Sequence, residues 1–410
     1  MAKFIPPKAT EAEALSITPD EGELIYDETG RVLRMGDGVT PGGNKLQGLG
    51  NVASPSANGL MSKEDKAKLD GLDSVATQTA NGLMSKEDKA KLDGISRDFF
   101  GDSPFLEFNN AGSILLKSGT VFSVGVVQYS ASDDVELDVA DLLDTGTIQP
   151  GKDYCVYLTT DKQFVVSLNS TFPTGTLADG ETAFSAENTR KIGGFHTLCV
   201  DAGEISGHPL SGFSAGDILP ASVWCLNHRP YSEPAGMVYC SALDFWVDIY
   251  LQSGTGEATE SVFGGTITTT RSQINHINDM LDVHKNLLSD SEFTSAADGS
   301  NQQTAISGAA APSTAGGHFD TAGRRMISDI GCEDCCGMLG QFLSGISAAG
   351  GSGWNNETYG TAYVLVAGGN YANGQNSGPT SRICNSSRND TAAIISARGM
   401  SPNRTSSMEG

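Results

Sequence analysis

One group of side chains, Cys332-Glu-Asp-Cys335-Cys336, has the chemistry to bind a metal or form a disulfide. It contains a C-x-x-C pair, a spacing used in zinc sites and in redox-active disulfides. A zinc finger needs a second pair of ligands at a suitable distance, and the nearest preceding histidine is His318. Three states stay open: a metal site, a disulfide among these cysteines or with Cys384, and reduced thiols in a core. We favour reduced thiols and expect no metal and no cofactor.

The histidines and acidic residues give no stronger sign of catalysis. His276 and His284 lie eight residues apart, without the spacing of the H-E-x-x-H zinc motif, and we interpret them as structural. The sequence lacks a G-x-S-x-G nucleophile motif and a Walker loop. Acidic pairs such as Asp133-Asp134 fall where turns are expected. The sequence therefore predicts that the protein is not an enzyme, and leaves open only two carboxylates brought together by folding.

A further short element, Trp354-Asn-Asn356, is similar to the Trp-Asn-Asp element of calcium-dependent sugar lectins. Its third residue is not a carboxylate, however, and no Glu-Pro-Asn or Gln-Pro-Asp partner occurs. Calcium prefers several oxygen ligands, most of them carboxylates. We therefore expect Trp354 to pack in a core and the asparagines to hold turns.

Composition narrows the partners that the chain can have. Its 410 residues include 26 Lys and Arg against 49 Asp and Glu, a net charge of −23. Nucleic acids and anionic membranes attract basic surfaces, so neither is an expected partner. No apolar run approaches the roughly 18 residues of a membrane-spanning helix, and the first residues lack the apolar core of a signal peptide. We expect synthesis in a host cytoplasm without a signal peptide, and no membrane insertion.

Two identical segments, Gly59–Gly71 and Gly82–Gly94, repeat with a period of 23 residues. Each has the S-x-x-D spacing of a helix N-terminal capping box and ends on a glycine, which predicts one short helix per copy. A helix of about nine residues is too short to be stable alone in water. Repeated units of this kind stabilise one another. We predict a helical repeat shaft in an oligomer over residues 51–98, with a flexible linker as the alternative.

Residues 1–50 predict one β-hairpin. Its strands are Glu23–Tyr26 and Arg31–Met35, and Gly30 is expected to supply positive φ in the turn between them. The glycine-rich segment Gly36–Gly43 is interpreted as a turn. A phosphate-binding loop would be followed by Lys-Ser or Lys-Thr and a helix, and neither pattern occurs.

From about residue 99 to 230, short β-branched and aromatic runs alternate with Gly, Asp, Asn and Pro. This pattern favours a β-sandwich. The predicted strands are Ser113–Leu116, Thr120–Tyr129, Tyr154–Thr159, Phe164–Leu168 and Ile192–Val200.

After Pro230 the pattern changes. Phe245–Leu251 predicts a buried strand, Ser272–Leu288 a long amphipathic helix, and Ser289–Gly299 a shorter helix that begins at a capping box. From there to Gly410 we expect few regular elements, and scattered apolar residues favour a folded, loop-rich domain over a disordered tail. These core candidates are Met326, Ile327, Met338, Phe342, Trp354, Tyr363–Val366, Ile394 and Ile395.

The order of these motifs resembles the major tropism determinant family of phage tail-fibre receptor-binding proteins. Glu21–Gly43 is similar to the family's N-terminal hairpin, and Lys117–Tyr157 with Asn188–His196 is similar to its intermediate β-domain. Phe245–Gly299 is similar to the opening of its C-type lectin domain. Gly368–Gly399 is similar to the variable region, which in the family opens on Gly-Gly-x-Trp and closes on Gly-Ala-Arg-Gly.

The chain departs from the family at several positions. Tyr371 replaces the tryptophan of the variable-region opening, and Ser396 replaces the first closing glycine. Gly340 and Phe342 stand where the family has core tryptophans. The Lys-Glu-Asp-Lys repeats resemble modules of other phage fibres and look inserted.

The resemblance implies a homotrimer with a multidomain, mainly β fold and an α+β C-terminus. Residues 1–50 would form a β-prism-like hairpin for virion attachment and residues 99–230 a β-sandwich, on either side of the repeat shaft at 51–98. Residues 231–410 would form a C-type lectin-like receptor-binding domain. This implies a tail fibre in the virion that binds phage tail or baseplate proteins through its N-terminus and a bacterial surface protein or glycan through its C-terminus. The alternative is a purely structural collar or baseplate fibre without receptor binding.

Carrying over the family's diversified positions gives twelve candidate receptor-binding residues. They are Asn370, Ala372, Asn373, Gly374, Asn376, Ile383, Asn385, Ser386, Asp390, Ala392, Ile394 and Ile395. The alternative is that the Asn and Ser positions form turns and that the two isoleucines belong to a core. Residues 357–410 carry three acidic residues and four arginines, or +1, so this region is nearly neutral. Such a surface suits hydrogen bonding to a glycan or a protein.

Overall fold

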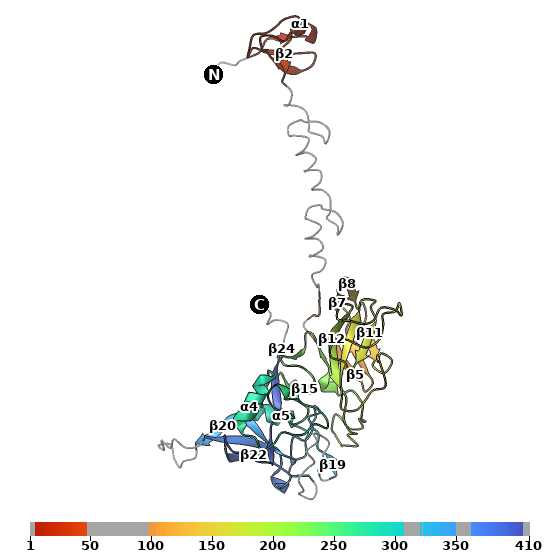
Figure 1. Ribbon diagram of the computed structural model, residues 1–410, viewed down its shortest axis with the longest axis vertical. Coiled ribbons are helices and arrows are strands. Elements are labelled where there is room, and N and C mark those ends of the chain that lie inside the picture. Colours follow the sequence, from red (N-terminus) through yellow and green to blue (C-terminus); the bar gives the residue numbers. More distant parts are fainter. Residues whose placement is uncertain are drawn as a thin grey trace. The chain divides into compact units, whose positions relative to one another are not determined.

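The chain forms two compact units in the computed structural model, residues 1–95 and 96–410 (Figure 1). The structure describes residues 5–46, 98–101, 103–306, 320–321, 323–349 and 362–404. Apart from Asp98, the predicted repeat shaft at 51–98 lies outside these residues, and so do His318 and the Trp354 element. Within the described part of the chain, no helix is long and apolar enough to span a membrane.

The described part of the N-terminal unit, residues 5–46, is a small four-stranded sheet with one short helix. The strand order is β1-β2-β3-β4, and the predicted hairpin is confirmed as the antiparallel pair β2–β3. The elements are β1 (Lys8–Ala9), α1 (Glu11–Leu15), β2 (Leu24–Asp27), β3 (Val32–Met35) and β4 (Asn44–Lys45).

The turn of this hairpin differs from the prediction. Arg31, not Gly30, has the positive φ, of 50°. The reason lies in Asp27, whose Oδ1 accepts the N–H groups of Thr29 and Gly30 at 3.0 and 2.8 Å. Asp27 is fully buried and its other oxygen pairs with Arg34 at 3.0 Å. The bond from Gly30 is the largest of the effects that lower the pKa of Asp27.

The glycine-rich segment after β3 is confirmed as a turn. Asp37 organises it, because its carboxylate accepts the N–H groups of Val39 and Thr40 and the Thr40 hydroxyl. These bonds, the Thr40 hydroxyl first, lower the pKa of Asp37. Strand β4 follows, so this segment does not open a helix in the way a phosphate-binding loop does.

The second unit begins with two sheets and a hairpin. One sheet has the order β5-β6-β9, the other β11-β10-β12-β13, and β7 pairs with β8. Both sheets contribute to one apolar core, for example Ile114 from the first and Val156 from the second. The strands are β5 (Leu106–Asn110), β6 (Ser113–Leu116), β7 (Val121–Val124), β8 (Val127–Ser130), β9 (Val135–Asp138), β10 (Asp153–Thr159), β11 (Phe164–Ser167), β12 (Thr189–His196) and β13 (Trp224–Cys225).

Most predicted strands of this region are confirmed, with two corrections. The strand predicted over Ile192–Val200 is β12, which begins earlier and ends at His196. The run Thr120–Tyr129 is not one strand but the hairpin β7–β8, which turns at Gly125 with φ 57°. Within β12, the pair Gly193-Gly194 has no room for side chains. A Cβ on Gly193 would lie 2.4 Å from the Trp224 carbonyl oxygen, and one on Gly194 2.4 Å from that of Tyr154. The Gly-Gly pair therefore lets β12 lie close to both neighbouring strands.

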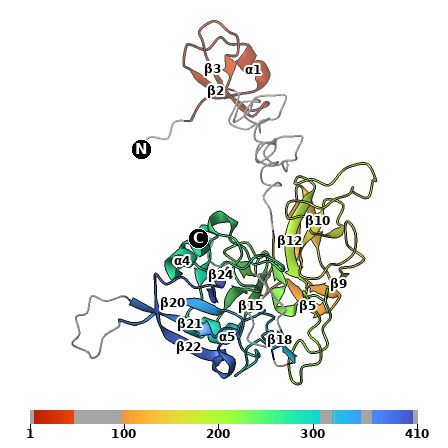
Figure 2. The same cartoon turned by 60° about the horizontal axis from the view of Figure 1, so that its bottom comes forward.

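The described remainder of this unit is built around two larger sheets and the helices α4 and α5 (Figure 2). The first sheet has the order β14-β24-β16-β15, and β17 also pairs with β24; the second has the order β22-β21-β20-β23. Helix α5 packs against β20, β21 and β22. The main elements are β14 (Arg229–Pro230), β15 (Met237–Cys240), β16 (Phe245–Asp248), α4 (Gln273–Asp282), β17 (Asn286–Leu287), α5 (Asp290–Ala296), β20 (Gly340–Ala349), β21 (Ala362–Gly368), β22 (Gly378–Ser387), β23 (Ile395–Ser396) and β24 (Gly399–Arg404).

Short elements complete this region. They are the 3-10 helices η1 (Pro220–Ser222), η2 (Gly256–Ala258) and η4 (Gly374–Asn376), and the two-residue strands β18 (Asp320–Thr321) and β19 (Arg324–Arg325). Loop residues between β12 and η1, such as Leu198 and Leu210, pack in the same core as Val247 and Phe293. The β-rich first part of this unit is therefore joined to the C-terminal part by shared packing.

Three predictions for this region were wrong in extent. The strand expected over Phe245–Leu251 is β16, which ends at Asp248. The helix expected over Ser272–Leu288 ends at Asp282, because His284 takes φ 59° and Leu287 pairs with Gly399 of β24. The region after Gly299, expected to have few regular elements, contains the long strands β20, β21 and β22. The capping box at Ser289 is confirmed: its hydroxyl accepts the Glu292 N–H, and the Glu292 carboxylate accepts the Ser289 N–H.

Candidate functional site: an amide-lined groove

A polar groove of about 460 Å³ lies beside η4 and the first half of β22. Five amide side chains line it, from Gln302, Gln303, Asn373, Gln375 and Asn376. The remaining lining residues are Ser381, Arg382 and Ile383 of β22. The two glutamines at 302 and 303 come from the segment after α5. They meet η4 because the Gln303 N–H donates to the Ser377 carbonyl at 2.7 Å.

The loop that carries η4 is held in one shape by its own asparagines. The Asn370 side chain accepts the Ala372 N–H at 2.9 Å, and the Asn373 side chain accepts the Asn370 N–H at 2.7 Å. Gly368 precedes the loop with φ 84°, and a Cβ there would lie 2.4 Å from the Cys335 carbonyl oxygen. Such internal bonding fixes the loop before any ligand arrives, which lowers the entropy cost of binding.

The positive charge of Arg382 is already paired. Its guanidinium forms an ion pair with Asp290 of α5, donates to the Thr294 hydroxyl at 2.7 Å and lies 4.9 Å from the centre of the Phe293 ring. Capping of α5 by Ser289 places Asp290 in the first turn of the helix. Because none of the lining residues is acidic, the groove has little net charge available to a ligand.

Several amide groups of the groove are not used within the protein. Among the described residues, the side chains of Gln303, Gln375 and Asn376 form no hydrogen bond, and the Asn373 side chain uses only its oxygen. The Gln302 amide donates to the Thr380 hydroxyl at 3.1 Å. Each primary amide has two N–H donors and one carbonyl acceptor. The groove therefore offers a ligand many hydrogen-bond donors and acceptors that lie side by side.

The structure separates the twelve predicted receptor-binding residues into groups. Asn373, Asn376 and Ile383 line the groove, and Ala372 and Gly374 are exposed in the same loop. Asn370 and Ile395 are buried, 4% and 8% exposed, so neither can be part of a contact surface in this chain. The remaining residues are at least partly exposed on the second half of β22 and the loop after it: Asn385, Ser386, Asp390, Ala392 and Ile394.

The alternative interpretation of these positions therefore holds for some of them. Asn370 and Asn373 do form a turn, and Ile395 packs in a core with Phe342 and Val366. Ile394 is 36% exposed and lies outside that core. Ala392 is partly buried and packs against the core.

Sequence reasoning missed five lining residues. Gln375, Ser381 and Arg382 lie within the predicted variable stretch but not at the positions carried over. Gln302 and Gln303 lie far upstream of it, in an irregular segment where Gln303 has φ 59°. No local pattern marks those two, since a long-range backbone bond brings them to the groove.

The cysteine group lies in the interior. Cys332, Cys335 and Cys336 are all buried free thiols, and burial raises the pKa of the Cys332 thiol. The fully buried Arg398 lies nearby and donates to three backbone carbonyl oxygens, those of Asp248, Ile249 and Glu333. In the described part of the chain, no three His, Cys, Asp or Glu residues are placed to hold a metal ion.

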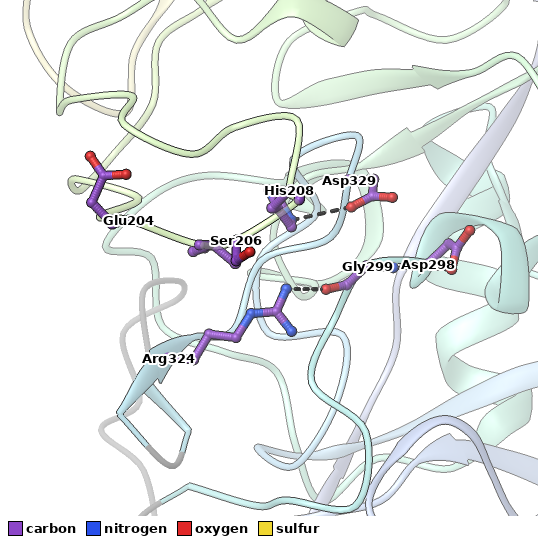
Figure 3. A pocket seen from close by; sticks show the side chains of 9 residues that line it. Glu204, Ser206, His208, Asp298, Gly299, Arg324 and Asp329 are labelled. Carbon is purple, nitrogen blue, oxygen red and sulfur yellow. Dashed lines mark hydrogen bonds and ion pairs between the residues drawn. The ribbon is translucent and has the colours of Figure 1, made fainter.

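A second cavity, of about 540 Å³, is lined by several charged residues, of which His208 and Asp329 pair with each other (Figure 3). The His208 Nδ1 accepts the Leu210 N–H at 3.1 Å, so a neutral ring carries its proton on Nε2, 3.4 Å from the Asp329 carboxylate. Burial lowers the pKa of His208. Arg324 donates to the Asn301 side chain and to the Gly299 carbonyl. These contacts join three loops, which is a structural role.

Comparison with known proteins found a family match for the middle region and structural similarity over nearly the whole chain. Residues 105–225 match the family described as the Mtd second domain. The chain is similar to the solved structures of the Major Tropism Determinant M1 variant (19% identity, TM-score 0.64) and I1 variant (20% identity, TM-score 0.64). The U1 variant gives 20% identity and a TM-score of 0.61. Each alignment covers 98% of this chain and 100% of the other. No curated protein sequence matches the chain.

The sheets of the structure and these likenesses define a mainly β protein, and a C-type lectin-like fold is consistent with them. Residues 105–225 match the Mtd second domain family, and the chain as a whole is similar in fold to the solved major tropism determinant structures. The family resemblance seen in the sequence is thereby confirmed.

Proposed function

We propose that the protein is a phage tail-fibre protein that binds a receptor on the host cell through residues 231–410. The observation that carries this proposal is the amide-lined groove, because it lies in the stretch that resembles the family's variable region and leaves several hydrogen-bonding groups unused. A likeness over 98% of the chain to proteins named tropism determinants supports it. Among the residues that the structure describes, no acidic residue or histidine lines the groove, which favours binding over catalysis.

The proposal includes a virion location, a homotrimer and attachment to tail or baseplate proteins through residues 1–50. Support for an oligomer comes from the N-terminal unit. Among residues 5–46, Ile25 is the one large apolar side chain that is buried, whereas Ile5, Leu15, Ile17 and Val39 are each at least 49% exposed. A sheet with so small a core needs burial from another chain to be stable.

A binding and competition experiment tests the proposal. Fluorescently labelled full-length protein should bind host cells in a saturable way, and unlabelled protein should block adsorption of the phage. A purely structural fibre would do neither. Absence of both effects, with a trimer confirmed in solution, would favour the structural alternative.

A matched pair of variants connects the binding to the groove. The variant Gln303→Ala/Gln375→Ala/Asn376→Ala removes three exposed amides of the groove. The control Gln128→Ala/Gln149→Ala/Gln163→Ala removes three exposed amides from the β-rich region that precedes residue 230. The groove variant should lose at least tenfold in affinity and the control should bind normally, with equal thermal unfolding for both. Equal binding by the two variants would place the receptor site elsewhere.

A further inference from the structure

We infer that the groove binds a neutral, hydroxyl-rich glycan, and that it does so without a bound cation. This inference rests on the proposed function, since it names the chemical class of the receptor. Three properties of the groove lead to it: the kind of hydrogen-bonding groups, the absence of an available charge, and the size and rigidity of the site.

The first property is the unused amide groups. Sugar hydroxyls both donate and accept hydrogen bonds, and a primary amide does the same. The side chains of Gln303, Gln375 and Asn376 can therefore pair with adjacent hydroxyls of a sugar ring. Asn373 adds an unused NH₂ group, because its oxygen accepts the Asn370 N–H. Ile383 supplies one apolar surface against which the C–H face of a ring can pack.

The second property is charge. Arg382 is the one charged residue among the described residues of the lining, and its guanidinium is paired with Asp290 and bonded to Thr294. The described part of the groove has no unpaired cationic side chain for a phosphate or an acidic sugar, and no carboxylate for a ligand that carries an amine. Calcium sites combine amide and backbone carbonyl oxygens with carboxylates that offset the charge of the cation, and among the described lining residues there is no carboxylate. The groove thus favours a ligand without charge.

The third property is size and rigidity. A volume of about 460 Å³ falls within the range of roughly 300–1,000 Å³ common for small-ligand sites. That suits a short segment of an oligosaccharide. Protein–protein contacts gain most of their affinity from buried aromatic and arginine anchors, and no aromatic side chain lines this groove. The fixed η4 loop keeps the amides in place, and several copies in an oligomer would strengthen a weak single contact.

Selective treatment of host cells tests the inference with the full-length protein. Periodate cleaves vicinal diols of sugars, whereas a broad protease removes exposed surface proteins. We expect periodate to reduce binding at least tenfold and protease to leave it within twofold. Binding that survives periodate and is lost after protease would identify a protein receptor and overturn this inference while the proposed function stands. Failure to bind untreated cells would overturn both.

Competition and chelation complete the test. Oligosaccharide released from the host envelope by mild acid is separated into neutral and acidic fractions by anion exchange. The neutral fraction should compete with binding of the wild-type protein, and a chelator should leave that binding unchanged. Competition by the acidic fraction alone, or loss of binding in the chelator, would contradict a neutral, cation-independent site.

Discussion

At the scale of single residues, the C-terminal region holds ion pairs inside its core. Lys285 donates to Asp248 at 2.6 Å, and both side chains are at most 6% exposed. The second Asp248 oxygen accepts the Gly399 N–H at 3.0 Å. This one carboxylate therefore links β16, β24 and the segment after α4. A buried pair of this kind adds little net stability, but its disruption leaves an unpaired charge.

Replacement of the lysine should therefore be costly. Lys285→Met leaves Asp248 buried without its partner, and we expect a loss of about 3–5 kcal/mol in the free energy of unfolding. The double variant Lys285→Met/Asp248→Asn should recover much of this lost stability, because the neutral amide oxygen can still accept the Gly399 N–H. Chemical unfolding measures the free energy of unfolding of both variants. If the double variant is no more stable than the single one, the cost does not come from the unpaired charge.

A second prediction at the scale of single residues concerns the loss of stability at low pH. Burial is the main reason that the pKa of His276 falls from 6.5 to about 4, with Asp279 opposing and Arg271 reinforcing the shift. His276 is fully buried and bonds through Nδ1 to the Gln252 side-chain oxygen at 2.6 Å. The unfolded chain binds a proton near pH 6.5 and the folded chain only near pH 4. Stability attributable to this group is therefore present above pH 6.5 and lost as the pH falls toward 4.

His276→Gln keeps a donor for Gln252 and cannot be protonated. We expect its free energy of unfolding to fall less steeply between pH 6.5 and 4, by up to about 3 kcal/mol over that interval. His284→Asn is the control, because His284 is exposed and Asn tolerates its positive φ. A slope in His276→Gln equal to that of the wild type would show that this histidine does not cause the acid sensitivity.

At the scale of elements, the sequence predicted features that depend on neighbouring residues, but not those that depend on pairing with distant strands. The capping box of α5 involves only Ser289 and Glu292, so the sequence located it correctly. The end of α4 was predicted too late, because apolar spacing continues through Leu287 although that residue pairs with distant Gly399. Strands β20 and β22 were missed because they are rich in Gly, Ser and Asn and their pairing with β21 is interrupted by irregular register.

The candidate site shows the same difference between local and long-range features. The variable stretch predicted one wall of the groove through Asn373, Asn376 and Ile383. The other wall, Gln302 and Gln303, depends on a backbone bond to Ser377 that no local pattern encodes. Charge pairing of Arg382 with Asp290 likewise joins residues 92 positions apart. Such contacts become visible only when the fold brings the segments together.

The cap of α5 can be tested directly. Ser289→Ala removes the acceptor for the Glu292 N–H, and we expect a loss of about 1 kcal/mol in the free energy of unfolding. Because Asp290 holds Arg382, binding to cells should weaken as well. Ser289→Asp should retain both properties, since Asp is an equally good N-cap. Thermal unfolding and cell binding are the measurements, and an alanine variant as stable as the aspartate variant would rule out the cap as the source.

At the scale of the whole molecule, the N-terminal unit has an unusual interior. Its centre is the buried pair Asp27 and Arg34 rather than a group of apolar side chains, and Arg34 also reaches Glu11 at 3.0 Å. Apart from Ile25, several of its larger apolar residues are exposed instead, among them Leu15, Ile17 and Val39. Exposed apolar surface on so small a unit is typical of an interface between chains. The sequence resemblance implied a homotrimer, and this distribution of residues supports the same proposal.

We therefore expect the assembly to depend on the exposed apolar residues of this unit. The variant Leu15→Ser/Ile17→Ser/Val39→Ser removes apolar area without touching the Asp27–Arg34 pair, and it should shift the protein from trimer toward monomer in light scattering at micromolar concentration. The control Val126→Ser changes a residue that is 80% exposed in the hairpin β7–β8 and should leave the mass unchanged. Because each chain retains its groove, the monomer should still bind host cells, but it should dissociate faster as avidity is lost. A triple variant that stays trimeric would show that the chains associate through other residues.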